Sequence, residues 1–389
     1  MKKIFFLSNI YLDDISVGIT KKVLAQIDAF NSNSINVEFF SGYVNDGVVI
    51  YNSNQEIVYK EKFRFNNKLY IKAFKNQILK KATYNFLKLH KDDIDGVYMR
   101  YIYFDYKYYK ILKLMKKNNK FTIIEAHTYP IKPTHWLSLK TIVYLNDLIY
   151  TKFIRKKIDL VVAICDVKNI WGRKTINIDN AIGKGQIIPK KKKEKSNSQI
   201  NIISVSTEYN YHGYDRVVSG LFDYYKTKQE SDPNIFINFV GTYLQSTISL
   251  VDKYNLGKYI KFVGRKTGNE LDILYDWADI GLGDLGRHRV GAFSGSCLKT
   301  KEYFGKGLPF ITSLVEPTYS KDYKYVLQIE ADDSPVNFYK VVEFYNICYS
   351  DSKLVNNMST YALEHFTWDK QLLPVFEFIK EFNNENTSN

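Results

Sequence analysis

Short apolar runs and helical patterns alternate along the chain, and the whole alternation occurs twice. In the first half, runs typical of β-strands lie at residues 3–9, 36–42, 96–101, 121–127 and 159–165. Between them, apolar residues recur at helical spacing over 19–31, 68–91, 105–118 and 136–157. Strands that alternate with helices form parallel sheets, because each crossover brings the chain back to the same end of the sheet. The first half therefore predicts a parallel sheet covered by helices.

The second half repeats this pattern. Strand-like runs lie at 200–206, 235–241, 260–264, 279–285 and 309–313, with helical patterns at 214–229, 244–255, 269–277 and 298–306. Between the halves, "PKKKKEKSNSQ" is polar, charged and without periodicity. Such a basic run can be a nucleic-acid-binding tail, but its place between two α/β halves favours a linker. We expect an N-terminal domain over 1–188, a linker over 189–199 and a second domain over 200–368.

Length and cysteine content restrict the class of protein further. A chain of 389 residues suits two domains rather than one core. Its three cysteines (Cys165, Cys297 and Cys348) have no paired spacing, which argues against a disulfide framework or a zinc site and fits a reducing compartment. The N-terminal apolar run is too short for a signal peptide, and no apolar window is long enough to span a membrane. We expect a cytoplasmic or peripheral protein.

Positive charge is concentrated in one segment of the first half. The formal net charge is +14, and residues 60–91 hold ten Lys and Arg against one acid, Glu61. Apolar residues recur there at helical spacing: Ile71, Phe74, Ile78, Ala82, Phe86 and Leu89. One interpretation is a helix with a buried apolar face and a solvated basic rim. The other is a surface that binds anionic lipid. Lys68, Lys72, Lys75 and Lys88, which lie near the apolar stripe, would then contact the lipid headgroups.

A nucleic-acid-binding protein would also use basic and aromatic residues together, because bases stack on aromatic rings. Here the 32 Tyr and 25 Phe mostly follow strand and helix periodicities, as core residues do. We therefore expect no nucleic-acid partner.

The segment "GSCLKTKEYFGKGLPFI", residues 295–311, carries the clearest chemistry. A Ser-Gly-Ser turn ahead of a helix exposes backbone N–H groups at its positive end, which suits an anionic diphosphate. Glu302 lies on the same helix face as Leu298, where its carboxylate can accept hydrogen bonds from sugar hydroxyls. The alternative is a glutamate that only serves the helix dipole. Neither G-x-G-x-x-G after a strand nor a P-loop occurs.

Three segments together resemble a known family. They are "SCLKTKEYFGKGLPFI", "YHGYDRVVSGL" (211–221) and "FVGRKTGNELDILYDWADIGLGDL" (262–285). They are similar to the retaining family 4 glycosyltransferases of the GT-B fold, and most similar to enzymes of bacterial surface polysaccharides such as capsule, exopolysaccharide or O-antigen. The resemblance covers nearly the whole chain. It implies two Rossmann-like domains facing across a cleft, and a C-terminal helix over 369–389 that crosses back to the first domain.

Carried over residue by residue, the resemblance implies two catalytic positions, His127 beside the transferred sugar and Glu302 at the nucleotide ribose. It also implies nucleotide-sugar contacts from Gly18 in the first domain and from the second-domain positions His212, Arg216, Gly264, Arg265, Ser296, Cys297, Leu298 and Lys299.

The sequence departs from the family pattern at several positions. The first acid of the E-x7-E motif corresponds to Ser294, and the Arg and Lys that usually hold the diphosphate correspond to Thr207 and His212. Arg287 and Arg289 in "GRHRVG" are our candidates for the missing charge, because a diphosphate leaving group needs a compensating cation. No Asp-x-Asp pair stands at a strand end, so we expect no metal and no cofactor.

The implied reaction is transfer of a sugar from a nucleotide-diphosphate sugar to a hydroxyl of a saccharide acceptor. The resemblance implies retention by front-face attack and an acceptor carried on polyprenyl diphosphate at the cytoplasmic face of the membrane. The basic segment 60–91 would then contact anionic lipid. The lost acid at Ser294 leaves open an alternative, a catalytically weak GT-B pseudoenzyme that serves as a binding subunit.

Overall fold

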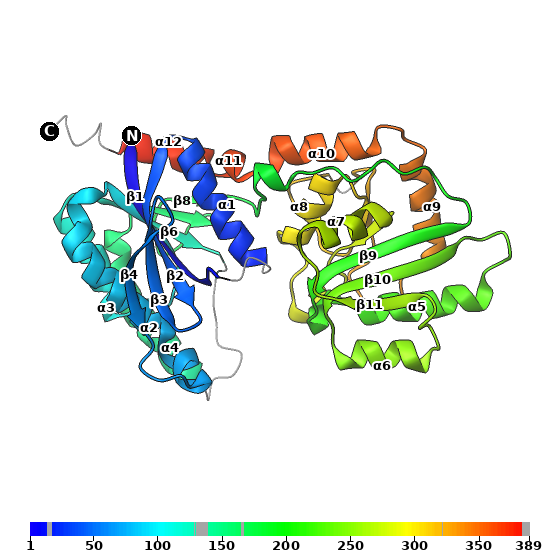
Figure 1. Cartoon of the computed structure of the whole chain (residues 1–389), viewed down its shortest axis with the longest axis horizontal. Coiled ribbons are helices and arrows are strands. Elements are labelled where there is room, and N and C mark those ends of the chain that lie inside the picture. The colour runs from blue at the N-terminus through cyan, green and yellow to red at the C-terminus, as the bar shows by residue number, and fades with distance from the viewer. Residues whose placement is uncertain (14–17, 128, 130–138, 165–166, 321, 383–389) are drawn as a thin grey trace. The chain divides into compact units, whose positions relative to one another are not determined.

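The computed structural model describes residues 1–13, 18–127, 129, 139–164, 167–320 and 322–382. The chain forms two compact units (Figure 1). The first comprises Met1–Asp179 and Trp368–Asn389, and the second comprises Asn180–Thr367. Each unit has its own sheet and is described by itself.

The sheet of the first unit has eight strands within the described residues, in the order β4-β3-β2-β1-β5-β6-β7-β8. All neighbours pair in parallel except in the hairpins β2–β3 and β3–β4. The strands are β1 (Lys2–Tyr11), β2 (Ile35–Val44), β3 (Gly47–Asn52), β4 (Ile57–Lys62), β5 (Gly96–Arg100), β6 (Phe121–Ala126), β7 (Leu160–Ala163) and β8 (Thr175–Asn177).

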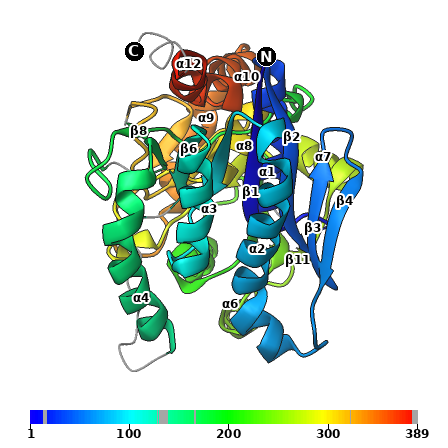
Figure 2. The same cartoon turned by 90° about the vertical axis from the view of Figure 1, so that its left-hand side faces the viewer.

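The helices of the first unit are α1 (Gly18–Ser32), α2 (Lys68–His90), α3 (Tyr106–Lys117), α4 (Leu139–Ile154), α11 (Trp368–Gln371) and α12 (Leu373–Glu381). Figure 2 views this unit from its helical side, where α2, α3 and α4 lie along the sheet. The C-terminal helices return to the first unit, as expected, because Phe376 of α12 packs edge-on against Phe30 of α1 with ring centroids 5.2 Å apart.

The hairpin of β3 and β4 was not among the predicted strands. Asn45 and Asp46 form the turn between β2 and β3, and Asn-Asp-Gly between apolar runs is a hairpin signal. β4 forms the edge of the sheet and carries Lys60 and Lys62, which discourage pairing with another chain.

The predicted helix over 68–91 is confirmed as α2, but its buried face is partly different. Ala82 and Phe86 are buried as expected, whereas Phe74 is 49% exposed and Leu89 is 78% exposed. Leu79 and Leu87 are buried instead, and so is Lys80, whose Nζ lies 2.5 Å from Asp105 Oδ2. The periodicity of the sequence predicted the position of the helix. Which lysine enters the core was determined by Asp105, the N-cap residue of α3.

The sheet of the second unit has six strands within the described residues, all parallel, in the order β11-β10-β9-β12-β13-β14. They are β9 (Gln199–Thr207), β10 (Asn234–Thr242), β11 (Ile260–Gly264), β12 (Ile280–Leu282), β13 (Phe310–Thr312) and β14 (Val326–Gln328). The helices are α5 (Tyr214–Thr227), α6 (Gln245–Lys253), α7 (Gly268–Trp277), α8 (Leu298–Lys306), α9 (Phe338–Tyr349) and α10 (Leu354–His365).

The segment 189–199, which we expected to be a linker, lies inside the second unit. Lys190 is buried there, and its ammonium group donates a hydrogen bond to the Ala278 carbonyl. The chain passes from the first unit to the second between Asp179 and Asn180, and it returns to the first unit between Thr367 and Trp368.

Strand order defines one switch point in each sheet. In the first, the chain builds outward from β1 through β2 and then returns to place β5 on the other side of β1. In the second, it builds outward from β9 to β11 and returns to place β12 beside β9. At such a point neighbouring loops leave the sheet in opposite directions, which opens a crevice at the carboxyl ends of the strands. Ligands of doubly wound sheets bind in that crevice.

Among the described residues, no helix is long and apolar enough to cross a membrane.

Candidate functional site

The switch point of the second sheet gathers three segments that sequence analysis had singled out. His212 follows β9, the "GRHRVG" segment follows β12, and the turn at Ser296 leads into α8. The first two segments touch through glycines, because a Cβ on Gly213 would lie 2.8 Å from the Gly286 nitrogen. Gly213 also has a φ of 70°, which favours glycine. The close approach of the two loops therefore requires glycine at position 213.

Asp284 is the centre of this site, and its side chain is fully buried directly after β12. Lys299 Nζ lies 2.7 Å from Asp284 Oδ1, and Arg287 Nε donates to Oδ2 at 2.7 Å. His212 Nε2 lies 3.4 Å from Asp284 Oδ1. The Tyr209 amide donates to His212 Nδ1 at 2.9 Å, which leaves the ring proton on Nε2, facing the carboxylate.

The charges of this cluster follow from its burial. Burial alone would raise the pKa of Asp284. The adjacent Lys299 and Arg287 outweigh burial and hold this pKa well below its usual range. Burial, with Lys299 nearby, lowers the pKa of His212 to about 3, so its imidazole is neutral. Burial would lower the pKa of Lys299, but Asp284 raises it well above its usual value. Two cations and one carboxylate leave a surplus of one positive charge.

The N-terminus of α8 lies beside this surplus. Its N-cap residue is Cys297, which provides no side-chain cap for the first N–H groups of the helix. The preceding turn is fixed from outside the helix, since Ser296 Oγ accepts from the Asn180 amide at 3.0 Å. Glu316, which is buried, accepts from the Cys297 amide at 3.3 Å. A helix N-terminus next to a buried cation surplus can hold an anion.

The two arginines of "GRHRVG" have different surroundings. The Arg287 side chain is 33% exposed, and its guanidinium carbon lies 4.3 Å from the ring centroid of Tyr211, as in a cation–π contact. Arg289 is held by two carboxylates, with Nη2 2.8 Å from Asp215 and Nε 2.7 Å from Asp333. The structure therefore brings Arg287 to Asp284 and places Arg289 in a separate ion cluster.

The other residues expected to contact the nucleotide are more dispersed. Glu302 lies on α8, where it accepts a hydrogen bond from the Tyr275 hydroxyl at 3.3 Å. Gly264 ends β11 with a φ of 75°, and Arg265 is exposed beside it, near Thr242 at the end of β10. Arg216 is buried and donates to the Ser334 carbonyl at 2.7 Å and to the Leu285 carbonyl, so it holds two loops.

In the first unit, His127 follows β6 and Gly18 begins α1. Two residues before His127, Glu125 is fully buried and accepts hydrogen bonds from Tyr98 and Gln26, each at 2.8 Å. Lys22 and Arg100, also buried, lie 3.6 and 3.3 Å from the same carboxylate.

The charges around His127 determine its protonation state. Burial, with help from Arg100, lowers the pKa of His127 to about 4. The imidazole is therefore neutral near pH 7, where it can donate and accept a hydrogen bond but lacks the second, acidic proton of an imidazolium.

Sequence analysis did not single out Asp284, Glu316, Tyr211 or Glu125, although each lies at the site of its unit. Asp284 had a detectable signal, a carboxylate that follows Ile280 and Leu282 near the end of the strand-like run 279–285. Glu316 had none, because it comes close to α8 only through the fold: Lys301 Nζ, fully buried, lies 2.7 Å from Glu316 Oε2.

The sequence matches no protein-family model and no curated protein. Solved structures are similar over nearly the whole chain. Sucrose-phosphate synthase from Thermosynechococcus elongatus is 14% identical with a TM-score of 0.66, covering 99% of this chain and 100% of that one. The catalytic domain of starch synthase IV from Arabidopsis thaliana, bound to ADP and acarbose, is 9% identical with a TM-score of 0.66, covering 98% and 99%. WaaG, a glycosyltransferase involved in lipopolysaccharide biosynthesis, is 10% identical with a TM-score of 0.56, covering 97% and 99%.

These neighbours are glycosyltransferases, and at such identities the likeness shows the fold. The protein has the GT-B fold, with two α/β units whose sheets are mainly parallel and a C-terminal segment that returns to the first unit. The predicted fold class is thereby confirmed. Membership of family 4 and the surface-polysaccharide role stay predictions.

Proposed function

We propose that the protein is a retaining glycosyltransferase that moves a sugar from a nucleotide-diphosphate sugar to a hydroxyl of a saccharide acceptor. One observation carries the proposal: a buried cation surplus lies beside the N-terminus of α8 at the switch point between β9 and β12. In a GT-B fold, that geometry suits the diphosphate of the donor.

The residues of this site have complementary roles in the proposal. Lys299 and Arg287 neutralise the charge that develops on the leaving diphosphate, and the planar fork of Arg287 can bind two oxygens. Asp284 keeps both cations in place. Glu302 accepts hydrogen bonds from the ribose hydroxyls. In the first unit, neutral His127 binds a hydroxyl of the transferred sugar.

We assign a front-face mechanism to the reaction. The acceptor oxygen forms a bond to the anomeric carbon, the bond from that carbon to the diphosphate breaks, and a diphosphate oxygen takes the acceptor proton. The anomeric configuration of the donor is then kept. Proton NMR of the product formed in the first turnover tests this step, because an inverted anomeric coupling constant would contradict retention.

Thermal-shift measurement with a panel of nucleoside diphosphates tests donor binding. One base should raise the unfolding midpoint clearly, since a ligand at a hundredfold excess over Kd stabilises by about 2.7 kcal/mol. Arg287→Gln should reduce this shift by about half or more, as a tenfold or greater loss of affinity would. Lys340→Met, which changes an exposed lysine of α9, should leave it unchanged. If no nucleoside diphosphate shifts the midpoint, the proposal is wrong.

A second candidate function rests on Ser294, which stands where the family pattern has an acid. It is a GT-B pseudoenzyme that binds a nucleotide sugar and supports an active partner. Slow hydrolysis of the bound nucleotide sugar separates the two candidates, because a pseudoenzyme binds the donor without cleaving it.

We further propose that the acceptor is carried on polyprenyl diphosphate and that the first unit contacts the inner face of the cell membrane. The support comes from α4 as well as α2. Ile142, Leu145, Ile149 and Phe153 form one stripe of α4, and each is at least 50% exposed. Asp147 and Ile154 anchor the opposite side, which is buried. An apolar stripe near basic residues suits a surface that enters the headgroup region of a bilayer.

The basic part of this surface lies on α2. Lys68, Lys72 and Lys88 are exposed, whereas Lys75 is half-buried, with its ammonium 4.7 Å from the ring centroids of both Tyr11 and Tyr43. Each lysine near an anionic surface contributes about 1 kcal/mol.

Sedimentation with vesicles tests this surface. Wild-type protein should bind vesicles of phosphatidylglycerol but not of phosphatidylcholine, and binding should weaken as salt shortens the screening length to about 8 Å. Changing Lys68, Lys72 and Lys88 to Gln should remove the salt-dependent part of vesicle binding. Ile149→Ser together with Phe153→Ser should remove the part that does not depend on salt. Absence of binding at low salt would contradict the membrane proposal and leave the transferase proposal standing.

A further inference from the structure

One face of the second sheet is incompletely covered along β9, β10 and β11. On β10, Ile235, Ile237 and Phe239 are buried in the core, whereas Phe236 and Asn238, which point the other way, are only half-buried. The same face extends onto β11, because Asn238 is paired with Lys261 and paired residues point to the same side of a sheet. An aromatic ring, an amide and an ammonium group are thus arranged side by side on a half-exposed surface.

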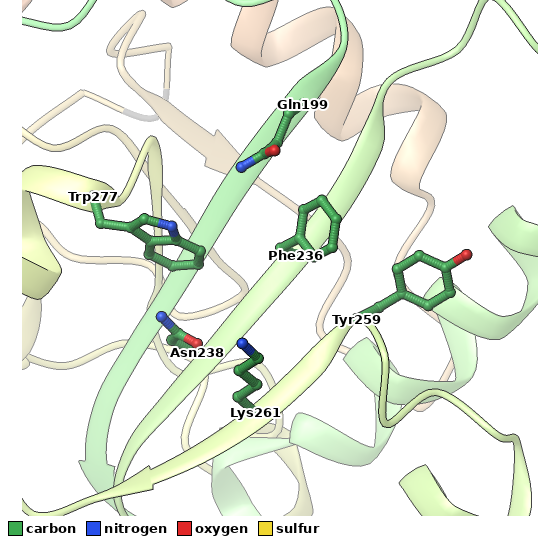
Figure 3. A pocket seen from close by; sticks show the side chains of 6 residues that line it. All are labelled: Gln199, Phe236, Asn238, Tyr259, Lys261 and Trp277. Carbon is green, nitrogen blue, oxygen red and sulfur yellow. The ribbon is translucent and has the colours of Figure 1, made fainter.

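These side chains line a pocket. Its volume is about 230 Å³, and its lining residues are Gln199, Phe236, Asn238, Tyr259, Lys261 and Trp277. Figure 3 shows the six side chains in front of β9, β10 and β11, with Phe236 between Trp277 and Tyr259. The pocket lies toward the amino-terminal half of the strands, since Gln199 is the first residue of β9 and Phe236 the third of β10. It is therefore separate from the Asp284 cluster, which follows the carboxyl end of β12.

The chemistry of the lining suits one class of ligand. The flat faces of Phe236 and Trp277 pack well against an apolar ring face. The amides of Gln199 and Asn238 both donate and accept hydrogen bonds, and Lys261 donates. A pyranose has an apolar C–H face and a rim of hydroxyls that also donate and accept, so it matches both parts of the pocket.

Size and charge argue against a second nucleotide. The volume is below the roughly 300–1,000 Å³ of pockets that enclose drug-sized ligands. Lys261 is the single cation among the lining residues, so a diphosphate would find little compensation. A single sugar ring at the end of a chain, or one unit within it, fits better.

We propose that this pocket is a saccharide-binding subsite that holds one pyranose unit of the acceptor or product chain. The identity of that chain rests on the proposed function, under which the substrate is a saccharide. Tethering the chain at a second point would raise the local concentration of acceptor ends near the enzyme.

The test uses the full-length protein and hexasaccharides of glucose (α1,4 and β1,4), mannose, galactose and N-acetylglucosamine. Ligand contact should change the fluorescence of Trp277, one of four tryptophans in the chain. At least one hexasaccharide should give a saturable signal in wild type. Trp277→Ala should abolish the signal, and Trp277→Phe should keep most of the affinity when binding is measured by calorimetry.

Two further variants distinguish the loss of a ligand contact from misfolding of the protein. The double variant Asn238→Ala, Lys261→Ala changes only polar side chains. It should lower the affinity for the same hexasaccharide at least fivefold. Tyr339→Ala, which removes an aromatic ring that is 39% exposed on α9, is the matched control and should bind like wild type.

Five outcomes are decisive. No saturable binding of any hexasaccharide up to 20 mM, or binding that Trp277→Ala leaves unchanged, overturns the subsite. Self-association that Trp277→Ala abolishes would also overturn it and would make this face a contact between copies. Failure of nucleoside diphosphate binding with intact hexasaccharide binding would contradict the proposed function alone. Pocket variants with normal nucleoside diphosphate affinity and reduced hexasaccharide affinity support the subsite.

Discussion

Arg287 and Arg289 lie two residues apart but differ in how well a ligand can reach their charge. Arg287 shares one buried carboxylate with Lys299, while Arg289 is neutralised by two exposed ones. Arg287→Gln should therefore weaken nucleoside diphosphate binding at least tenfold, and Arg289→Gln should change it less than threefold. Calorimetry with the nucleoside diphosphate and with the free nucleoside makes the comparison, because a diphosphate contact affects only the first ligand. Equal losses for both variants would restore the sequence-based prediction that the two arginines act as a pair.

His212 predicts a specific pH dependence of stability. Its folded pKa is about 3, so between that value and about 6.5 the unfolded chain binds a proton that the folded protein does not. Stability from this group is therefore lost as pH falls below about 6.5, by at most about 1.4 kcal/mol per pH unit.

Urea unfolding at pH 7, 6 and 5 measures this effect. Over that window the depressed carboxyl Asp284 contributes little, since its stabilisation is lost only as pH falls further. The variant His212→Gln should have a flatter profile than wild type, whatever its stability at pH 7. His365→Gln changes a histidine whose side chain is 51% exposed and should keep the wild-type slope. Parallel profiles for His212→Gln and wild type would show that folding does not shift the pKa of His212.

At the scale of elements, the site depends on two loops that meet at Gly213. Gly213 and Gly291 have the same φ of 70°, but a Cβ would strike the backbone of Leu285 and Gly286 only at Gly213. Gly291→Ala should cost about 1–2 kcal/mol, the usual penalty of the left-handed conformation. Gly213→Ala should cost clearly more and should also weaken nucleoside diphosphate binding, because it separates the loop of His212 from the loop of Asp284. Chemical unfolding and calorimetry of both variants check this; equal costs would mean that the loops can separate freely.

The elements themselves were mostly predictable. Helices α1, α2, α5 and α8 were predicted within two residues of their bounds, because their apolar periodicity extends over several turns. The short strands β8 and β14 were not, since their three residues are mostly half-exposed and lack the apolar run that marks the equally short but fully buried β12 and β13. The pairing of β8 and β14 depends on the neighbouring strands β7 and β13.

At the scale of the whole molecule, the proposed function assigns nucleotide binding to one unit and contact with the transferred sugar to the other. The diphosphate and ribose contacts proposed above (Arg287, Lys299 and Glu302) lie on the second unit, and His127 lies on the first. His127→Ala should therefore leave the Kd of the nucleoside diphosphate unchanged and lower kcat at least tenfold. His90→Ala, which changes a half-exposed histidine of α2 in the same unit, is the control and should keep both values. A changed Kd would show that His127 acts on the nucleotide, and an unchanged kcat would make its role structural.

The amino-acid sequence by itself determined the two α/β halves, most elements, and the segments at the switch point of the second sheet. These features are local, because periodicity, glycine positions and strand ends are written in neighbouring residues. The tertiary structure decided which charges meet: that Asp284 holds Lys299 and Arg287, that Arg289 is neutralised elsewhere, and that Glu125 pairs with Lys22 and Arg100. It also decided that β3 and β4 extend the first sheet and that the half-exposed face of β9–β11 forms a pocket. Ion pairs and pockets join residues far apart in the chain, so their partners depend on strand order and register, which no short stretch of sequence specifies.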